Sequence, residues 1–151
     1  VSLNEEVELL RHIPMFANIE PSKLKLLAFT SERLTFRAGQ DLCTQGDMGD
    51  AAFIIIEGSA DVLINTPAGV TSVTTVGKND VVGEIAILCD VPRTATVRAL
   101  EDVVALRISK ELFFRLVREF PNMAVEIMRE LAASLARTTS QLSQALGRAA
   151  D

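Results

Sequence analysis

A glycine, a carboxylate and an arginine lie close together in the middle of this 151-residue chain, within residues 83–95. Gly83 is followed directly by Glu84, and Arg93 stands behind a proline and before small residues. Glycine lets the backbone approach a ligand closely and adopt unusual dihedral angles. A carboxylate accepts hydrogen bonds from sugar hydroxyls, N–H groups at a turn or helix start hold an anion, and an arginine fork binds phosphate oxygens. The stretch therefore suits a ligand that carries both hydroxyl groups and a phosphate.

The elements that must position this stretch follow from changes of periodicity along the chain. Residues 3–12 and 21–29 have apolar residues at helical spacing, whereas residues 33–108 contain short apolar or alternating runs separated by Gly, Asn and Asp turns. Ser109 is a good N-cap, so residues 109–146 are predicted to be helical with a break at Pro121. Short strands at such regular spacing predict a barrel or jelly roll. We expect a mainly β fold with flanking helices, as a single domain over residues 1–151.

Composition excludes several classes of function. The net charge is −5 and basic residues are scattered, so no footprint for direct nucleic-acid binding is present. No apolar run reaches about 18 residues and no signal peptide is present, which predicts a cytoplasmic protein without membrane contact. Cys43 and Cys89 fit small thiols in a reducing compartment, and His12 is the single histidine. One histidine argues against metal sites and most acid–base catalysis, so we expect no enzyme activity, no metal and no cofactor.

Residues 82–97 resemble the phosphate-binding cassette of cyclic nucleotide-binding domains. The family pattern is roughly F-G-E-[LIM]-A-L, a short spacer and P-R-[TSA]-A-x-V, and this chain reads VGEIAIL and PRTATV, with Val82 in place of the usual aromatic. Shorter matches are FRAG, QGD, IEG and KND, the last with Asn79 where glycine is usual. The likeness extends over roughly residues 8–140. It implies an eight-stranded β-roll over about 33–108, with N-terminal helices before it and two C-terminal helices over about 109–146.

The resemblance also implies a role for each residue of the cassette. Glu84 would accept the ribose 2′-hydroxyl of a bound cyclic nucleotide, and Arg93 would neutralise its cyclic phosphate. Main-chain N–H groups after Glu84 would donate to the phosphate, and the residues after Arg93 would add a donor. The cassette residues expected to bind ligand are Gly83, Glu84, Ile85, Ala86, Arg93, Thr94 and Ala95.

The base is less determined than the phosphate. Val62, Val73 and Thr74 match positions that line the base in the catabolite-activator branch, and ordinary barrel core is the alternative explanation. Thr138-Thr139 resembles the Thr-Ser pair that reaches the base in that branch, so Thr138 is also a candidate ligand-binding residue. The apolar wall and Thr138 favour cyclic AMP over cyclic GMP as the ligand.

The last helix carries a second pattern. Apolar residues and one threonine at three-four spacing predict the seam of a short coiled coil, and packing of the helix on its own barrel is the alternative. In the family this helix serves as a lid, as a dimer seam or as both, so a homodimer through Met128–Ala145 is one expected partner. The predicted seam is Met128, Leu131, Leu135, Thr138, Leu142 and Ala145.

These observations predict a cyclic nucleotide sensor domain that signals through its terminal helices to an unidentified effector protein or fused module. One alternative is a regulatory fragment of a larger channel, kinase or transcription factor, because the chain begins at Val1 and carries no helix-turn-helix after its last helix. Another is a barrel that binds only proteins and leaves its cassette empty. A cupin-type metalloenzyme would need histidine ligands that the sequence lacks.

Overall fold

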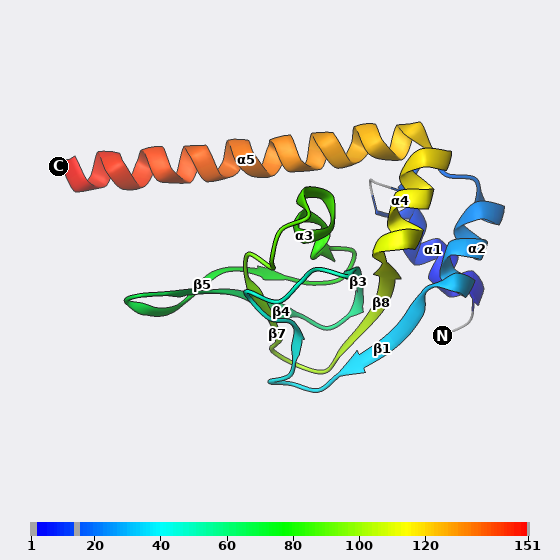
Figure 1. Ribbon diagram of the computed structural model, residues 1–151, viewed down its shortest axis with the longest axis horizontal. Helices are drawn as coiled ribbons and strands as arrows, with labels where there is room; N and C mark the ends of the chain where they lie inside the picture. Colours follow the sequence, from blue (N-terminus) through cyan, green and yellow to red (C-terminus); the bar gives the residue numbers. More distant parts are fainter. Residues whose placement is uncertain (1–2, 14–15, 151) are drawn as a thin grey trace.

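The computed structural model describes residues 3–13 and 16–150. Helices enclose a pair of β-sheets from one end, and the last helix runs across the top (Figure 1). The helices are α1 (Leu3–Arg11), α2 (Pro21–Thr30), α3 (Glu84–Cys89), α4 (Lys110–Glu119) and α5 (Pro121–Ala150). The strands are β1 (Glu32–Phe36), β2 (Asp41–Cys43), β3 (Ala51–Glu57), β4 (Ala60–Thr66), β5 (Gly69–Val76), β6 (Val81–Val82), β7 (Thr96–Ala99) and β8 (Val103–Ser109).

The eight strands form two four-stranded antiparallel sheets, in the orders β1-β8-β3-β6 and β2-β7-β4-β5. This arrangement confirms the predicted mainly β roll with flanking helices. The shortest strand, β6, pairs with β3 through Phe53 and Ile54 and leads directly into Gly83 and α3. The cassette is therefore attached to the most buried strand of the molecule.

Strand β3 is apolar on both faces because both faces are covered. Side chains alternate along a strand, and Ala52, Ile54 and Ile56 pack in a cluster with the helices, whereas Phe53 and Ile55 pack in a second cluster inside the roll. Six of its seven residues are buried. A fully buried strand reads as a continuous apolar run rather than as an alternating one, which explains the AAFIII sequence.

Helices α1, α2 and α4 close one end of the roll through the first of these clusters (Figure 1). Leu10, Leu24 and Phe113 are almost fully buried there. The predicted N-cap of α4 is confirmed, because the Ser109 hydroxyl accepts a hydrogen bond from the Leu112 N–H over 3.2 Å. Among the described residues, no helix is both long and apolar enough to cross a membrane.

Helix α5 is a single helix of 30 residues, which corresponds to a length of about 45 Å. Met123 and Ile127 in its first turns are buried against the helical cluster, and the side chains of residues 132–147 are all exposed. The helix continues beyond the roll in the direction of the β4–β5 hairpin (Figure 1). Its far half therefore contributes no buried side chain among residues 132–147.

Candidate functional site

Gly83 begins the cassette in a conformation that favours glycine. Its φ is +86°, in the left-handed region, and it is the N-cap of α3. A Cβ at this position would lie 2.5 Å from Nη1 of Arg93 and 3.2 Å from the carbonyl oxygen of Ala51. Two constraints therefore favour glycine at position 83: the positive φ angle and the close approach of Arg93.

Arg93 is the buried cation of the site, with an exposed fraction of 5%. Its Nη1 donates to the carbonyl oxygen of Gly83 over 2.9 Å, and its Nη2 donates to that of Ala51 over 2.7 Å. Its own N–H donates to the Asp47 carbonyl over 2.7 Å. These bonds fix the plane of the guanidinium, whose five N–H groups outnumber the two carbonyl acceptors.

Asp50 connects Arg93 with the strand and helix behind it. Its carboxylate lies 3.7 Å from Nη2 of Arg93 and 3.1 Å from Nη2 of Arg107 in β8. Its carbonyl oxygen accepts from the Lys110 N–H at the start of α4 over 2.9 Å. Nζ of Lys110 in turn lies 3.2 Å from the carboxylate of Asp90, which ends α3. The cassette is therefore joined to α4 by both main-chain and side-chain contacts.

Glu84 is half-buried at the first position of α3. Burial raises the pKa of its carboxyl group, and the charge of Glu130 on α5 raises it further, while its own N–H and the Arg93 charge act in the opposite direction. The first turn of a helix leaves N–H groups without intrahelical partners, and Gly83 supplies no side-chain acceptor for them. The start of α3 therefore places the carboxylate next to the N–H groups of the first helical turn.

A cavity of about 480 Å³ lies between the roll and α5, and we call it the α5 cavity. Glu84 is its cassette residue. The roll side is formed mainly by the end of β5 and the turn into β6, and the other side by one face of α5. Its lining residues are Ile13, Thr74, Thr75, Val76, Asn79, Asp80, Val81, Glu84, Ile127, Glu130, Leu131, Ser134 and Arg137.

Two of the predicted site residues, Glu84 and Thr74, line this cavity. Gly83 and Arg93 are not among its lining residues. Gly83 directly precedes Glu84, and its carbonyl oxygen accepts from Nη1 of Arg93. The other cassette residues lie in the same segment: Ala86 is buried, Ala95 is half-buried, and Ile85 and Thr94 are exposed. The cassette is therefore assembled as a local unit beside the cavity.

The predicted base-binding residues are more scattered. Val62 packs against the core inside the roll, and Val73 has an exposed fraction of 57% beside a register shift between β4 and β5. Thr138 is exposed, and its hydroxyl donates to the Ser134 carbonyl over 3.0 Å. The structure does not bring these three side chains into the lining of the α5 cavity.

Sequence reasoning missed the polar residues that α5 contributes to the cavity, Glu130, Ser134 and Arg137. Their spacing places them on one helix face, which is the available signal. The predicted seam included Leu131 and so assumed that this side of the helix faces outward. In the structure Leu131 packs against the core. The polar lining follows from this orientation of the helix.

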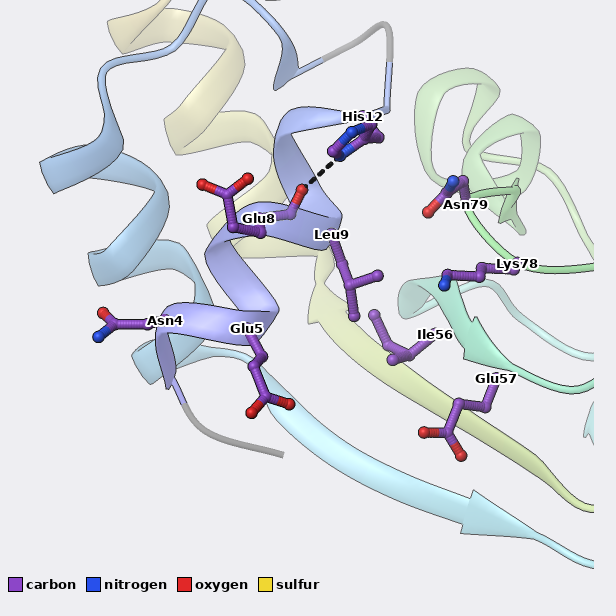
Figure 2. A pocket seen from close by; sticks show the side chains of 9 residues that line it. All are labelled: Asn4, Glu5, Glu8, Leu9, His12, Ile56, Glu57, Lys78 and Asn79. Atoms are coloured by element: carbon purple, nitrogen blue, oxygen red, sulfur yellow. Dashed lines mark hydrogen bonds between the residues drawn. The ribbon is translucent and has the colours of Figure 1, made fainter.

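A second cavity, of about 610 Å³, lies between α1 and the end of β3 (Figure 2). Leu9 and Ile56 point into it, and Lys78 reaches toward it from the opposite side (Figure 2). His12 lies at its edge, where Nδ1 is 2.6 Å from the carbonyl oxygen of Glu8. The imidazole thus caps the end of α1 through a main-chain contact, as expected for a histidine at a helix end.

Comparison with known proteins gives consistent results. The chain is 27% identical over 137 residues to a CRP-like cAMP-activated global transcriptional regulator of Mycobacterium tuberculosis, covering 90% of this chain and 61% of that protein. It is 34% identical over 123 residues to a cAMP-dependent protein kinase regulatory subunit of Dictyostelium discoideum, covering 79% of this chain and 36% of that protein. The chain therefore spans less than two thirds of either relative.

Among solved structures, the Catabolite Activator Protein of Thermus thermophilus superposes with a TM-score of 0.79 at 24% identity. The match covers 86% of this chain and 62% of that one, and it supports the fold. The family profile described as the cyclic nucleotide-binding domain matches residues 33–120. This range begins within β1, contains Gly83, Glu84 and Arg93, and ends just after α4. By this match and by its roll and cassette, the chain belongs to the cyclic nucleotide-binding domain family.

Proposed function

We propose that this chain is a sensor that binds a cyclic purine nucleotide at the cassette, with the ligand extending into the α5 cavity, and that cyclic AMP is preferred to cyclic GMP. The observation that carries the proposal is the geometry of Arg93, which is buried and is oriented by two carbonyl oxygens, one of them that of Gly83 next to Glu84. The names of two relatives, a cAMP-activated regulator and a cAMP-dependent kinase subunit, support cyclic AMP as the ligand.

In this proposal Arg93 binds the cyclic phosphate, assisted by N–H groups of Ile85 and Ala86. Glu84 accepts a hydrogen bond from the ribose 2′-hydroxyl. Thr74, on the roll side of the cavity, faces the base. Charge-assisted hydrogen bonds of this kind contribute about 1.5–3 kcal/mol each, so two or three of them supply a substantial share of the roughly 8 kcal/mol that micromolar binding requires.

The signal would leave the site through α4 and α5. Ligand at Glu84 also faces α5 across the cavity, and Asp50 and Asp90 join the cassette to the start of α4. A ligand shifts such an equilibrium only by its difference in affinity for the two helix arrangements. The function proposed is therefore regulatory binding without catalysis, with an effector protein or fused module as the recipient.

A second copy of this chain is the partner that α5 favours. Exposed residues along α5, apolar except for one threonine, alternate at steps of three and four, the spacing of a coiled-coil seam. This proposed seam differs from the predicted one because Leu131 is turned toward the core. The proposed seam is Val125, Met128, Ala132, Leu135, Thr139, Leu142 and Leu146. The cavity-lining residues lie on another face of the helix, so pairing and ligand binding are compatible.

Isothermal titration calorimetry of nucleotide-free protein with cyclic AMP and cyclic GMP tests the proposed ligand. We expect a dissociation constant in the micromolar range or tighter for cyclic AMP and weaker binding of cyclic GMP. Arg93→Ala is the control for the site. No heat with either nucleotide at millimolar concentration would reject nucleotide sensing and favour a barrel that binds only proteins.

A further inference from the structure

Helix α2 is apolar on two sides, although only one side packs against the rest of the molecule. Leu24, Leu27 and Ala28 are buried in the helical cluster. Leu26 and Phe29 have exposed fractions of 54% and 77%. A helix that is apolar all round is normally buried on all sides. The sequence of α2 therefore fits a helix whose second side is also covered.

The two exposed side chains form one surface, and we call Leu26 and Phe29 the α2 patch. They are three positions apart, so they are neighbours on the helix. Phe29 has the largest exposed fraction among the large apolar side chains of the described residues. Helix α2 lies at the outer edge of the helical end of the molecule, where a partner can reach it (Figure 1). Apolar side chains exposed singly are ordinary, whereas two adjacent large ones indicate an interaction surface.

Lysines flank the α2 patch on both sides. Lys25 is four positions before Phe29, and Lys23 is three positions before Leu26, so each lysine neighbours one residue of the patch. Both lysines are exposed, and the ion pairs of the described residues include neither of them. Helix α2 contains no aspartate or glutamate. The α2 patch is therefore locally positive on a chain whose net charge is −5.

These charges decide which partner fits the α2 patch. Two copies of the patch placed face to face would bring the lysines of both copies together, which disfavours a second copy of this chain. The net charge of −5 disfavours an anionic membrane surface. A helix with an apolar stripe and carboxylates beside it satisfies both features, because its aliphatic side chains cover the patch while its carboxylates meet the lysines.

We propose that the α2 patch is the docking site for an acidic amphipathic helix of a partner protein, with Phe29 as the apolar anchor and Lys23 and Lys25 as the charged rim. This inference goes beyond nucleotide binding, because none of these residues lies in the cassette or lines the α5 cavity.

The probe is a fluorescein-labelled peptide of two consecutive Leu-Glu-Glu-Leu-Leu-Glu-Glu heptads, which places the leucines on one side of a helix and the glutamates on the other. Its binding to the nucleotide-free protein is followed by fluorescence anisotropy. One comparison peptide carries lysine in place of every glutamate, and a second carries serine in place of every leucine. We expect the acidic peptide to bind and each comparison peptide to bind at least about tenfold more weakly.

Variants of exposed residues then locate the site. Phe29→Ser and Leu26→Ser should each weaken binding of the acidic peptide by about tenfold or more, because they remove its apolar contact. Lys25→Glu should weaken it by about fivefold, because an attraction becomes a repulsion. Leu100→Ser, which changes a leucine with an exposed fraction of 51% outside α2, and Lys78→Glu, at an exposed lysine in the turn before β6, are the matched controls. Each control should change the affinity by less than about twofold.

Thermal unfolding should show that all these variants remain folded, since the substituted side chains are exposed. Wild-type affinity in both Phe29→Ser and Leu26→Ser overturns the proposed site, and so does an equal loss in Leu100→Ser. Equal binding of the lysine-containing peptide overturns the choice of an acidic partner. Absence of binding of the acidic peptide to the wild-type protein at millimolar concentration overturns the docking site and leaves the proposed nucleotide binding in place.

Discussion

Arg93 and Gly83 are bound to each other at the start of α3: Nη1 of the arginine donates to the glycine carbonyl over 2.9 Å. The same nitrogen occupies the place that a Cβ at Gly83 would need. The two residues are ten positions apart, yet each fixes the other, because the arginine orients the turn and the glycine leaves room for the arginine. The proposed phosphate site is thus centred on a short segment, and the start of β3 supports it, because Nη2 of Arg93 donates to the Ala51 carbonyl oxygen.

Gly83→Ala should damage both the fold and the site. A left-handed φ of +86° costs a residue with a Cβ about 1–2 kcal/mol of stability, and the contact with Nη1 forces Arg93 to move. Affinity for cyclic AMP should fall by about tenfold or more. Gly39→Ala is the matched control, since Gly39 has φ +89° and nothing within 4 Å of its virtual Cβ. Chemical denaturation should show a loss in both variants that is larger in Gly83→Ala, with lost affinity in Gly83→Ala alone.

Arg93→Ala should weaken cyclic AMP binding by about 2–3 kcal/mol, because it removes the cation that faces the phosphate. It also leaves the carbonyl oxygens of Gly83 and Ala51 without their donors, so the free energy of unfolding should fall as well. Arg93→Lys keeps the charge without the planar fork, so its affinity for cyclic AMP should lie between that of the wild-type protein and that of Arg93→Ala. Arg98→Ala, which removes an exposed arginine paired with Asp41 at 2.8 Å, should bind normally. Calorimetry showing wild-type affinity in Arg93→Ala would contradict the phosphate assignment.

Much of this cassette could be predicted from sequence because its constraints are local. Gly83, Glu84 and Arg93 lie within one short segment, and their chemistry depends on order and spacing. The Asp50–Arg107 contact could not be predicted, because the two residues are 57 positions apart and meet through the pairing of β3 with β8. Strand β6 could not be predicted either, because its two residues are too few to show the periodicity of a strand.

The orientation of α5 shows where the sequence pattern was ambiguous. Leu131 and Ala132 are adjacent apolar residues, so either can continue a seam that contains Met128 and Leu135. Packing decided between them, because Leu131 contacts the helical cluster and Ala132 is exposed. The predicted seam and the exposed stripe of α5 therefore share three residues and differ at the positions between them.

Glu84→Gln should have opposite effects on stability and on binding. Burial is the main cause of the raised pKa of Glu84, so its contribution to stability is fully present below the usual carboxyl range and is lost as the pH rises through the folded-state pKa. The glutamine variant should therefore be more stable than the wild-type protein at neutral pH, and the difference should close toward acid pH. Its affinity for cyclic AMP should fall by about 1–2 kcal/mol, because the ribose hydroxyl loses a charged acceptor.

Urea unfolding followed across this pH range measures the effect on stability, and calorimetry at neutral pH measures the effect on binding. Glu32→Gln, at an exposed position of β1, provides the control for a lost carboxylate. A Glu84→Gln variant that is less stable than the wild-type protein at neutral pH would show that the carboxylate, rather than its burial, holds the start of α3 in place.

The last prediction uses two adjacent threonines to identify the seam of α5. Thr139 lies between Leu135 and Leu142 on the exposed stripe that we propose as the seam, whereas Thr138 belongs to the seam predicted from sequence, and its hydroxyl donates to the Ser134 carbonyl. Both side chains are exposed in the single chain, so neither substitution should unfold it. Thr139→Glu should convert a dimer to a monomer, because it places unpaired charges between two apolar faces.

Thr138→Glu makes the same chemical change one residue earlier and should leave the dimer in place, since a charge that flanks a seam remains in water. Leu135→Glu, at a position shared by both seams, should also give a monomer. Sedimentation equilibrium with and without cyclic AMP measures the mass of each variant. Dissociation by Thr138→Glu and not by Thr139→Glu would restore the predicted seam, and it would require Leu131 to leave the core when two helices pair. A wild-type monomer at every concentration would leave α5 as a wall of the cavity without a partner helix.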